Sequence, residues 1–270
     1  MPGESNLNLT YFDYFGETGV FAGFGAGEEN GDTIWTTLQR NRVTRAVGTG
    51  QRQFYYPPIL DGEVAPHSWS FLKPVSTLTL GSGESEVDLP SDFGVFCGPI
   101  TAVTGSSNNS RTYEMVGEAE VRRAQNSMPD ATGFPKLFAL VPLKGVDADS
   151  ASRYKLTVWP TTDAAYVLSF PYTILPDALS VARPYSYGGM QHAETILASC
   201  KYAWERDMDN ITGGPQYQNF MERLAASVAM DRRHQPQSLG KNRDASVGAD
   251  GLRQISRHQS GNPTVSWVSL

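Results

Sequence analysis

Histidines are the side chains in this sequence with the widest capacity for chemistry, because a neutral imidazole can bind a metal ion or accept a proton. The four histidines of the chain are His67, His192, His234 and His258. They are scattered, and none has a cysteine or another histidine at the spacing of a metal site. We interpret them as single surface histidines and predict no metal site.

Glu205, Asp207 and Asp209 are clustered carboxylates of the kind that can bind a cation. A calcium-binding loop needs a further oxygen ligand two residues on and then a glycine, but Ile211 and Thr212 occupy those positions. We therefore interpret the cluster as the solvated end of a helix.

Two further patterns could suggest phosphate binding or catalysis, but the residues around them do not support either function. The glycine-rich residues 23–27 follow no predicted strand and lack the Lys-Ser or Lys-Thr pair of a phosphate loop. The carboxylates available as a general acid and base are Asp88, Asp92, Glu114 and Glu118. Their spacing in the sequence favours no two of them as a catalytic pair. The sequence therefore predicts no catalytic residue, no cofactor and no enzyme.

Composition indicates a folded protein with an acidic balance. The chain has 270 residues, of which 40% are hydrophobic and 19% charged, and its net charge is -6. This excludes wholesale disorder and a surface that grips nucleic acid throughout. The residues at 1–5 lack the apolar core of a secretory signal, and no run of about 18 apolar residues predicts a membrane span. Cys97 and Cys200 are interpreted as small buried side chains, with a disulfide as the alternative.

The elements that position these side chains change character along the chain. Residues 1–58 are predicted to be mostly helical, with a glycine-rich connector at 16–31. Asp32 or Thr33 is the expected cap of a helix whose pattern fades at 48–50. The apolar residues expected near one face of that helix are Ile34, Trp35, Leu38 and Val43.

Residues 59–187 show short strand patterns separated by turn-rich segments. The predicted strands are 77–80, 86–89, 100–104, 111–116, 137–142, 154–159 and 166–172. The glycine-rich residues 81–83 are expected to join the first two as a hairpin. A short helix is predicted at 117–124. This spacing favours an antiparallel β-sandwich or partly open barrel, and hence an α+β fold.

Residues 188–234 return to a helical period. One apolar stripe is predicted from Ile196, Leu197, Cys200, Ala203 and Trp204. Gly213 and Gly214 end that helix, and Pro215 opens the next. The inner face of the second helix is expected to carry Phe220, Met221, Leu224, Ala225 and Val228. We predict a helical hairpin that packs on the N-terminal helices.

The tail at residues 235–270 shows no sustained period. It carries four basic residues against Asp244 and Asp250, a net charge of +2, which leaves -8 for residues 1–234. Residues 264–270 alternate apolar and polar side chains, as a β-strand added to a partner would. The alternative is a tail that folds back on its own β-domain.

Several motifs, taken in their order and spacing, carry a family resemblance. They are Phe54-Tyr55-Tyr56-Pro57-Pro58, Trp69-Ser70-Phe71-Leu72, Leu89-Pro90-Ser91-Asp92-Phe93, Phe134-Pro135 and Leu156-Thr157-Val158-Trp159-Pro160, continued by Ala229-Met230-Asp231 and Leu239-Gly240-Lys241-Asn242. Over residues 33–246 the chain resembles the head-to-tail adaptor proteins of tailed bacteriophages.

The resemblance implies a virion protein at the head-tail junction, made in the host cytoplasm. It implies a homo-oligomeric, dodecameric ring between the portal protein and a tail tube, nozzle or stopper protein. Genomic DNA would pass through the lumen without specific binding, and no membrane is involved. The helices are expected to flank the channel, and the β-domain to meet neighbouring subunits and tail proteins.

The tail is the expected portal-binding element. The residues expected to make that contact are Lys241, Arg243, Arg253, Arg257, Val265, Trp267, Val268 and Leu270. Two alternatives remain for the whole chain: another tail or fibre-associated structural protein, and a cell-envelope hydrolase.

Overall fold

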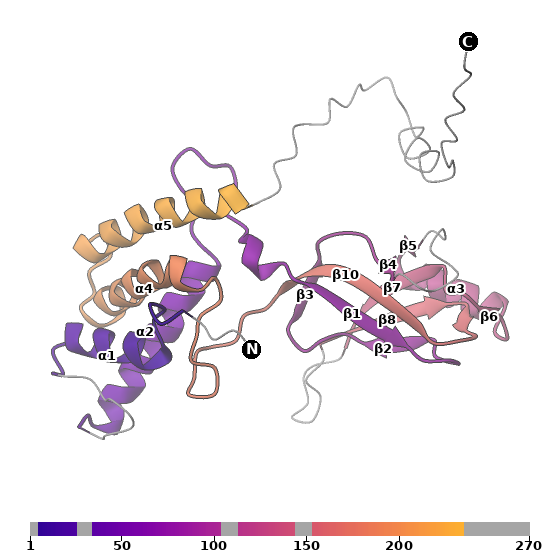
Figure 1. The fold of residues 1–270 in the computed structure, drawn as a ribbon, viewed down its shortest axis with the longest axis horizontal. Helices are drawn as coiled ribbons and strands as arrows, with labels where there is room; N and C mark the ends of the chain where they lie inside the picture. Colours follow the sequence, from indigo (N-terminus) through magenta and orange to yellow (C-terminus); the bar gives the residue numbers. More distant parts are fainter. Residues whose placement is uncertain (1–4, 26–33, 104–112, 144–152, 235–270) are drawn as a thin grey trace, which may run out of the picture. The chain divides into compact units, whose positions relative to one another are not determined.

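Helices near both ends of the described chain come together in a computed structural model that describes residues 5–25, 34–103, 113–143 and 153–234. The helices are α1 (Tyr11–Phe21), α2 (Thr37–Tyr55), α4 (Met190–Met208) and α5 (Pro215–His234). Figure 1 shows α4 between α5 and α2, and α4 contacts each of the other three helices. The predicted packing of a C-terminal helical hairpin on the N-terminal helices is confirmed.

Helix α4 is buried along most of its length because it is the central helix. The predicted stripe is confirmed, since every member is buried: Ile196, Leu197, Cys200, Ala203 and Trp204. On α5, Phe220, Leu224 and Val228 are buried as expected. Ala225 is exposed, so its predicted place on the inner face is wrong.

The crossing of α2 and α4 is close enough to require a glycine. A Cβ atom added at Gly50 would lie 2.6 Å from the backbone Cα and N atoms of Cys200. The Ser199 hydroxyl donates a hydrogen bond to the Gly50 carbonyl oxygen at 2.8 Å. Helix α2 therefore continues through 48–50, where the sequence pattern was expected to fade, because the glycine belongs to a helix-helix contact.

Helix α2 begins later than predicted because a capping box fixes its start. The Thr36 hydroxyl accepts from the Gln39 backbone N–H, and the Gln39 side chain accepts from Thr36 N. Neither Asp32 nor Thr33 is therefore the cap. Trp35 is buried ahead of the helix and donates from Nε1 to the Phe24 carbonyl at 3.1 Å.

Two of the four apolar residues expected on the inner face of that helix are mostly exposed. The exposed fractions are 70% for Ile34 and 60% for Leu38, whereas Trp35 and Val43 are buried. Ile34 precedes the helix, and the spacing of five residues places Leu38 about 140° from the buried Val43, so the predicted face is wrong in part.

Strands of the middle region form two four-stranded sheets and one short pair. In the first sheet β1 (Val75–Leu80), β3 (Phe93–Phe96) and β4 (Thr101–Ala102) all pair antiparallel with β10 (Tyr166–Ile174). The second has the order β2 (Glu86–Asp88), β8 (Tyr154–Trp159), β7 (Leu137–Pro142), β5 (Glu114–Met115), with β5 parallel to β7. The pair is β6 (Thr132–Gly133) parallel to β9 (Thr161–Thr162).

The α+β class is confirmed, with open sheets that are antiparallel for the most part. Phe93 of β3 packs against Tyr154 of β8, with ring centroids 5.7 Å apart, so the two larger sheets share a core. The predicted short helix is α3 (Glu118–Ser127). The division of the chain into regions 1–58, 59–187, 188–234 and 235–270 stays a prediction.

The predicted hairpin between the first two strands is wrong. β1 pairs with β10 and β2 with β8, so residues 81–83 cross from one sheet to the other. Thr162 organises this crossing: its buried hydroxyl bonds to the backbone of Gly81 and of Glu84, and its carbonyl accepts from Gly83 N at 2.7 Å. A glycine-rich turn alone does not decide which strands pair.

Replacing Gly50 by alanine should destabilise the protein. The new methyl group meets the α4 backbone, which cannot yield without moving the helix, so the free energy of unfolding should fall by about 1–3 kcal/mol. Gly48→Ala is the matched control, since nothing lies within 4 Å of its added Cβ. It should stabilise the helix by about 0.5–1 kcal/mol. Urea unfolding of both variants measures the difference, and equal stabilities would contradict the close crossing.

Candidate functional site

The eight tail residues predicted to bind the portal lie outside the described residues. The described chain nevertheless gathers polar side chains at the end of α5, immediately before that tail. The candidate site comprises the last turns of α5 and residues 56–74 between α2 and β1, which we call the connector.

Asp231 is the centre of this site. Its side chain is 2% exposed, and its carboxylate accepts from His67 Nε2 at 2.8 Å and from Ser70 N at 3.1 and 3.2 Å. The Ser70 hydroxyl donates to the same carboxylate. One side chain of α5 thus binds three donors of the connector.

The position of Asp231 makes these donors necessary. It lies in the last turn of α5, where the helix dipole disfavours a negative charge. Burial removes the water that would otherwise solvate the carboxylate. The connector supplies the missing donors, so the end of α5 and residues 67–70 are fixed together.

An aromatic cluster surrounds the connector and joins it to α2 and α4. Trp69 stacks on Phe54 with ring centroids 4.5 Å apart and donates from Nε1 to the Phe54 carbonyl at 2.9 Å. His192 of α4 lies 5.3 Å from Trp69 and 5.2 Å from Phe71, centroid to centroid. The connector is therefore held by packing as well as by Asp231.

A hollow of about 390 Å³ opens beside this cluster, lined by Ser70, Phe71, His192, Asp231 and residues 188–191. Gly188 has φ +93°, and a Cβ there would lie 2.9 Å from His192 Cδ2 and 3.0 Å from Phe71 Cζ. The backbone thus approaches the rings closely at a position that only glycine suits.

Serine, histidine and aspartate meet here, but in an order unsuited to nucleophilic catalysis. An activated serine needs its hydroxyl on the imidazole, with the imidazole oriented by the carboxylate. Here both the Ser70 hydroxyl and the His67 imidazole bond to Asp231. The arrangement positions the connector, and it lacks the serine-to-imidazole bond of a catalytic triad.

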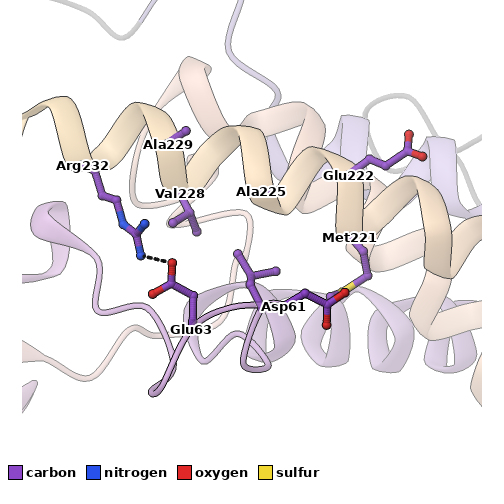
Figure 2. A pocket seen from close by; sticks show the side chains of 9 residues that line it. Asp61, Glu63, Met221, Glu222, Ala225, Val228, Ala229 and Arg232 are labelled. Atoms are coloured by element: carbon purple, nitrogen blue, oxygen red, sulfur yellow. Dashed lines mark ion pairs between the residues drawn. The ribbon is translucent and has the colours of Figure 1, made fainter.

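A second hollow, of about 440 Å³, lies between α5 and residues 60–63. We call it the α5 groove; Figure 2 shows its side chains. Its apolar lining is Leu60, Met221, Ala225, Val228 and Ala229, and its charged lining is Asp61, Glu63, Glu222 and Arg232. Arg232 and Glu63 form an ion pair at 2.8 Å. The groove is therefore apolar inside and mainly acidic at its edges.

The prediction of surface histidines is wrong for two of the four. His192 is 3% exposed and the His67 side chain 8% exposed, because both belong to the cluster around the connector. Sequence reasoning missed Asp231 as well. Its spacing of three residues from Val228 and seven from Leu224 places a carboxylate on the apolar face of α5, and that was the available signal.

The interpretation of Glu205, Asp207 and Asp209 as a solvated helix end is wrong for Glu205. That side chain is 5% exposed and accepts from Gln216 N at 3.2 Å. It therefore satisfies a backbone donor in the first turn of α5. No cluster of three or more metal-binding side chains occurs among the described residues. Of the helices described, none has the length and hydropathy to cross a membrane.

The two cysteines are free and differ in exposure. Cys200 is buried as predicted, and burial raises the pKa of its thiol to about 12. Cys97 is exposed, so its predicted burial is wrong.

In the native protein at pH 8, one thiol per chain should therefore react with a maleimide, and two after denaturation. The Cys200 thiol is inaccessible and stays protonated well above this pH. Mass spectrometry of the labelled chain measures the result. Cys97→Ser should remove the native reaction, whereas native labelling of Cys200 would contradict the packing of α4.

Removing the Asp231 carboxylate should destabilise the protein strongly. Asp231→Ala leaves the connector donors without their acceptor and should lower the free energy of unfolding by about 3 kcal/mol. Asp88→Ala, at an exposed position on β2, is the control and should change it by less than about 0.5 kcal/mol. Similar unfolding midpoints for the two variants would show that the buried bonds contribute little.

Comparison with known proteins identifies the family. The family model described as SU10 adaptor protein matches residues 28–242, which include α2 to α5, both larger sheets and the connector. No curated protein matches the chain. The match spans most of the sequence, and the chain belongs to the SU10 adaptor protein family, a family of phage adaptor proteins.

Proposed function

We propose that this phage adaptor is a head-to-tail adaptor: a dodecameric ring that joins the portal to the tail and continues the DNA channel. The family match over residues 28–242 is the observation that carries the proposal. The tail tube, nozzle or stopper protein would bind the opposite side of the ring. The role is structural, without a catalytic step or cofactor.

The charge balance supports a channel for DNA. Residues 1–234 carry a net charge of -8, from the -6 of the whole chain and the +2 of the tail. An acidic lumen repels phosphate groups, so DNA would slide through it without being retained. Helices of regions 1–58 and 188–234 would flank this lumen, and the β-domain at 59–187 would meet the tail proteins.

The tail is the proposed portal-binding segment. It follows α5 directly, and Asp231 fixes the turn from which it starts. Its basic residues Lys241, Arg243, Arg253 and Arg257 would pair with carboxylates of the portal. Its final alternating residues, Val265, Trp267, Val268 and Leu270, would bury their apolar side chains as an added strand.

Deleting residues 241–270 should abolish co-sedimentation of the chain with portal rings of its own phage. The folded part should be unaffected, since residues 1–234 form a separate compact unit. An unchanged urea unfolding midpoint is the control. If the truncated chain still co-sediments as well as the full chain does, the tail assignment is wrong.

Two full-length variants separate the contributions of the tail. Trp267→Ser with Leu270→Ser should weaken portal binding at every salt concentration, because the contact is apolar. Arg253→Gln with Arg257→Gln should weaken it mainly at low salt, because the contact is electrostatic.

A further inference from the structure

Helix α2 presents a basic face to solvent. Arg42, Arg45 and Arg52 are exposed and, with Thr49 between them, lie on the side of the helix opposite the buried Val43. The helix contains no aspartate or glutamate. A chain with a net charge of -6 thus concentrates positive charge on one helix.

The arginines of this face are available to a partner. Among the described residues, Arg42, Arg45 and Arg52 form no ion pair, and the guanidinium of Arg52 donates to the Thr49 hydroxyl at 3.0 Å. Unpaired arginines on a rigid helix keep their donors free for carboxylates or phosphates.

Apolar side chains extend the same face beyond the start of the helix. Leu38 is 60% exposed and Ile34 70% exposed, beside a tryptophan that is packed on Gly19 of α1. Val20 of α1 is 50% exposed. Arginine together with exposed apolar side chains is typical of a protein interface. A surface that binds only phosphate groups needs positive charge but no exposed apolar side chains.

The α5 groove has the complementary chemistry. Its lining is apolar along α5, and the carboxylates of Asp61 and Glu63 stand at its edge (Figure 2). Glu63 is paired with Arg232, but both side chains are partly exposed, so an incoming arginine can compete at little cost. Asp61 is exposed.

The basic face and the groove lie on different helices of the layer. Helix α4 stands between α2 and α5 (Figure 1), so one copy cannot bring its own α2 face into its own α5 groove without unpacking. Two different and complementary surfaces on one chain are what a head-to-tail contact between identical copies requires.

We propose that the α2 face of one copy docks in the α5 groove of the next copy, with Arg45 near Asp61 and the exposed Leu38 against the apolar groove lining. This inference rests on the proposed ring and deepens it, because it names the lateral contact. It assigns that contact to the helices instead of the β-domain.

Cross-linking in assembled virions tests the contact. In a Cys97→Ser background, one chain carries Arg45→Cys and another Asp61→Cys, and a short flexible bismaleimide is added to virions that contain both. Cys200 is buried and does not compete. A cross-linked dimer is expected in the mixture and not with either variant alone.

Charge reversal gives an independent readout in the same virions. The cysteine pair is moved to Asn41, one turn before Arg45 on α2, and to Glu222, which lines the groove on α5. Arg45→Glu or Asp61→Arg alone should then lower the cross-link yield about tenfold. The two reversals together should restore it. Arg123→Glu, on exposed α3, is the control and should leave the yield unchanged.

The outcomes separate this inference from the proposed function. A ring imaged at the head-tail junction without the mixed cross-link overturns the lateral contact and leaves the adaptor role standing. The cross-link with the chain imaged elsewhere in the virion supports the contact and overturns the adaptor role. If Arg45→Glu instead lowers binding of the full chain to a DNA duplex and leaves the cross-link unchanged, the arginines bind phosphate and the docking proposal is wrong.

Discussion

The buried carboxylate of Asp231 constrains the described structure more than any other single group. It lies at the end of a helix where neither water nor the helix dipole would stabilise a negative charge. The donors of His67 and Ser70 satisfy it, and these hydrogen bonds fix the end of α5 against the connector to the first strand. The aromatic cluster around Trp69 then ties that connector to α2 and α4.

This fixed layer is well suited to an adaptor. The close crossing at Gly50 and the packing of Trp35 on Gly19 hold α2 with one face toward α4 and the other outward. Helix α5 presents a surface of different chemistry on the far side of α4. A subunit that meets neighbours through distinct faces needs such rigidity, because a mobile face would lose entropy at every contact.

Local periodicity predicted the elements well, and long-range pairing poorly. The apolar stripe of α4 and the short apolar strand at 137–142 depend on neighbouring residues, and both were found from the sequence. The partner of β1 is β10, far along the chain, and a turn between β1 and β2 carries no information about that choice. The same limit hid the site, since His67 and Asp231 are separated by 164 positions. The one local signal of their contact was a carboxylate, Asp231, on the apolar face of α5.

The most direct test of the adaptor role is electron microscopy of the full-length chain mixed with portal rings of its own phage. The account predicts an added ring of subunits on one end of each portal. Bare portal rings beside free chain, under conditions in which the chain is folded, would contradict it.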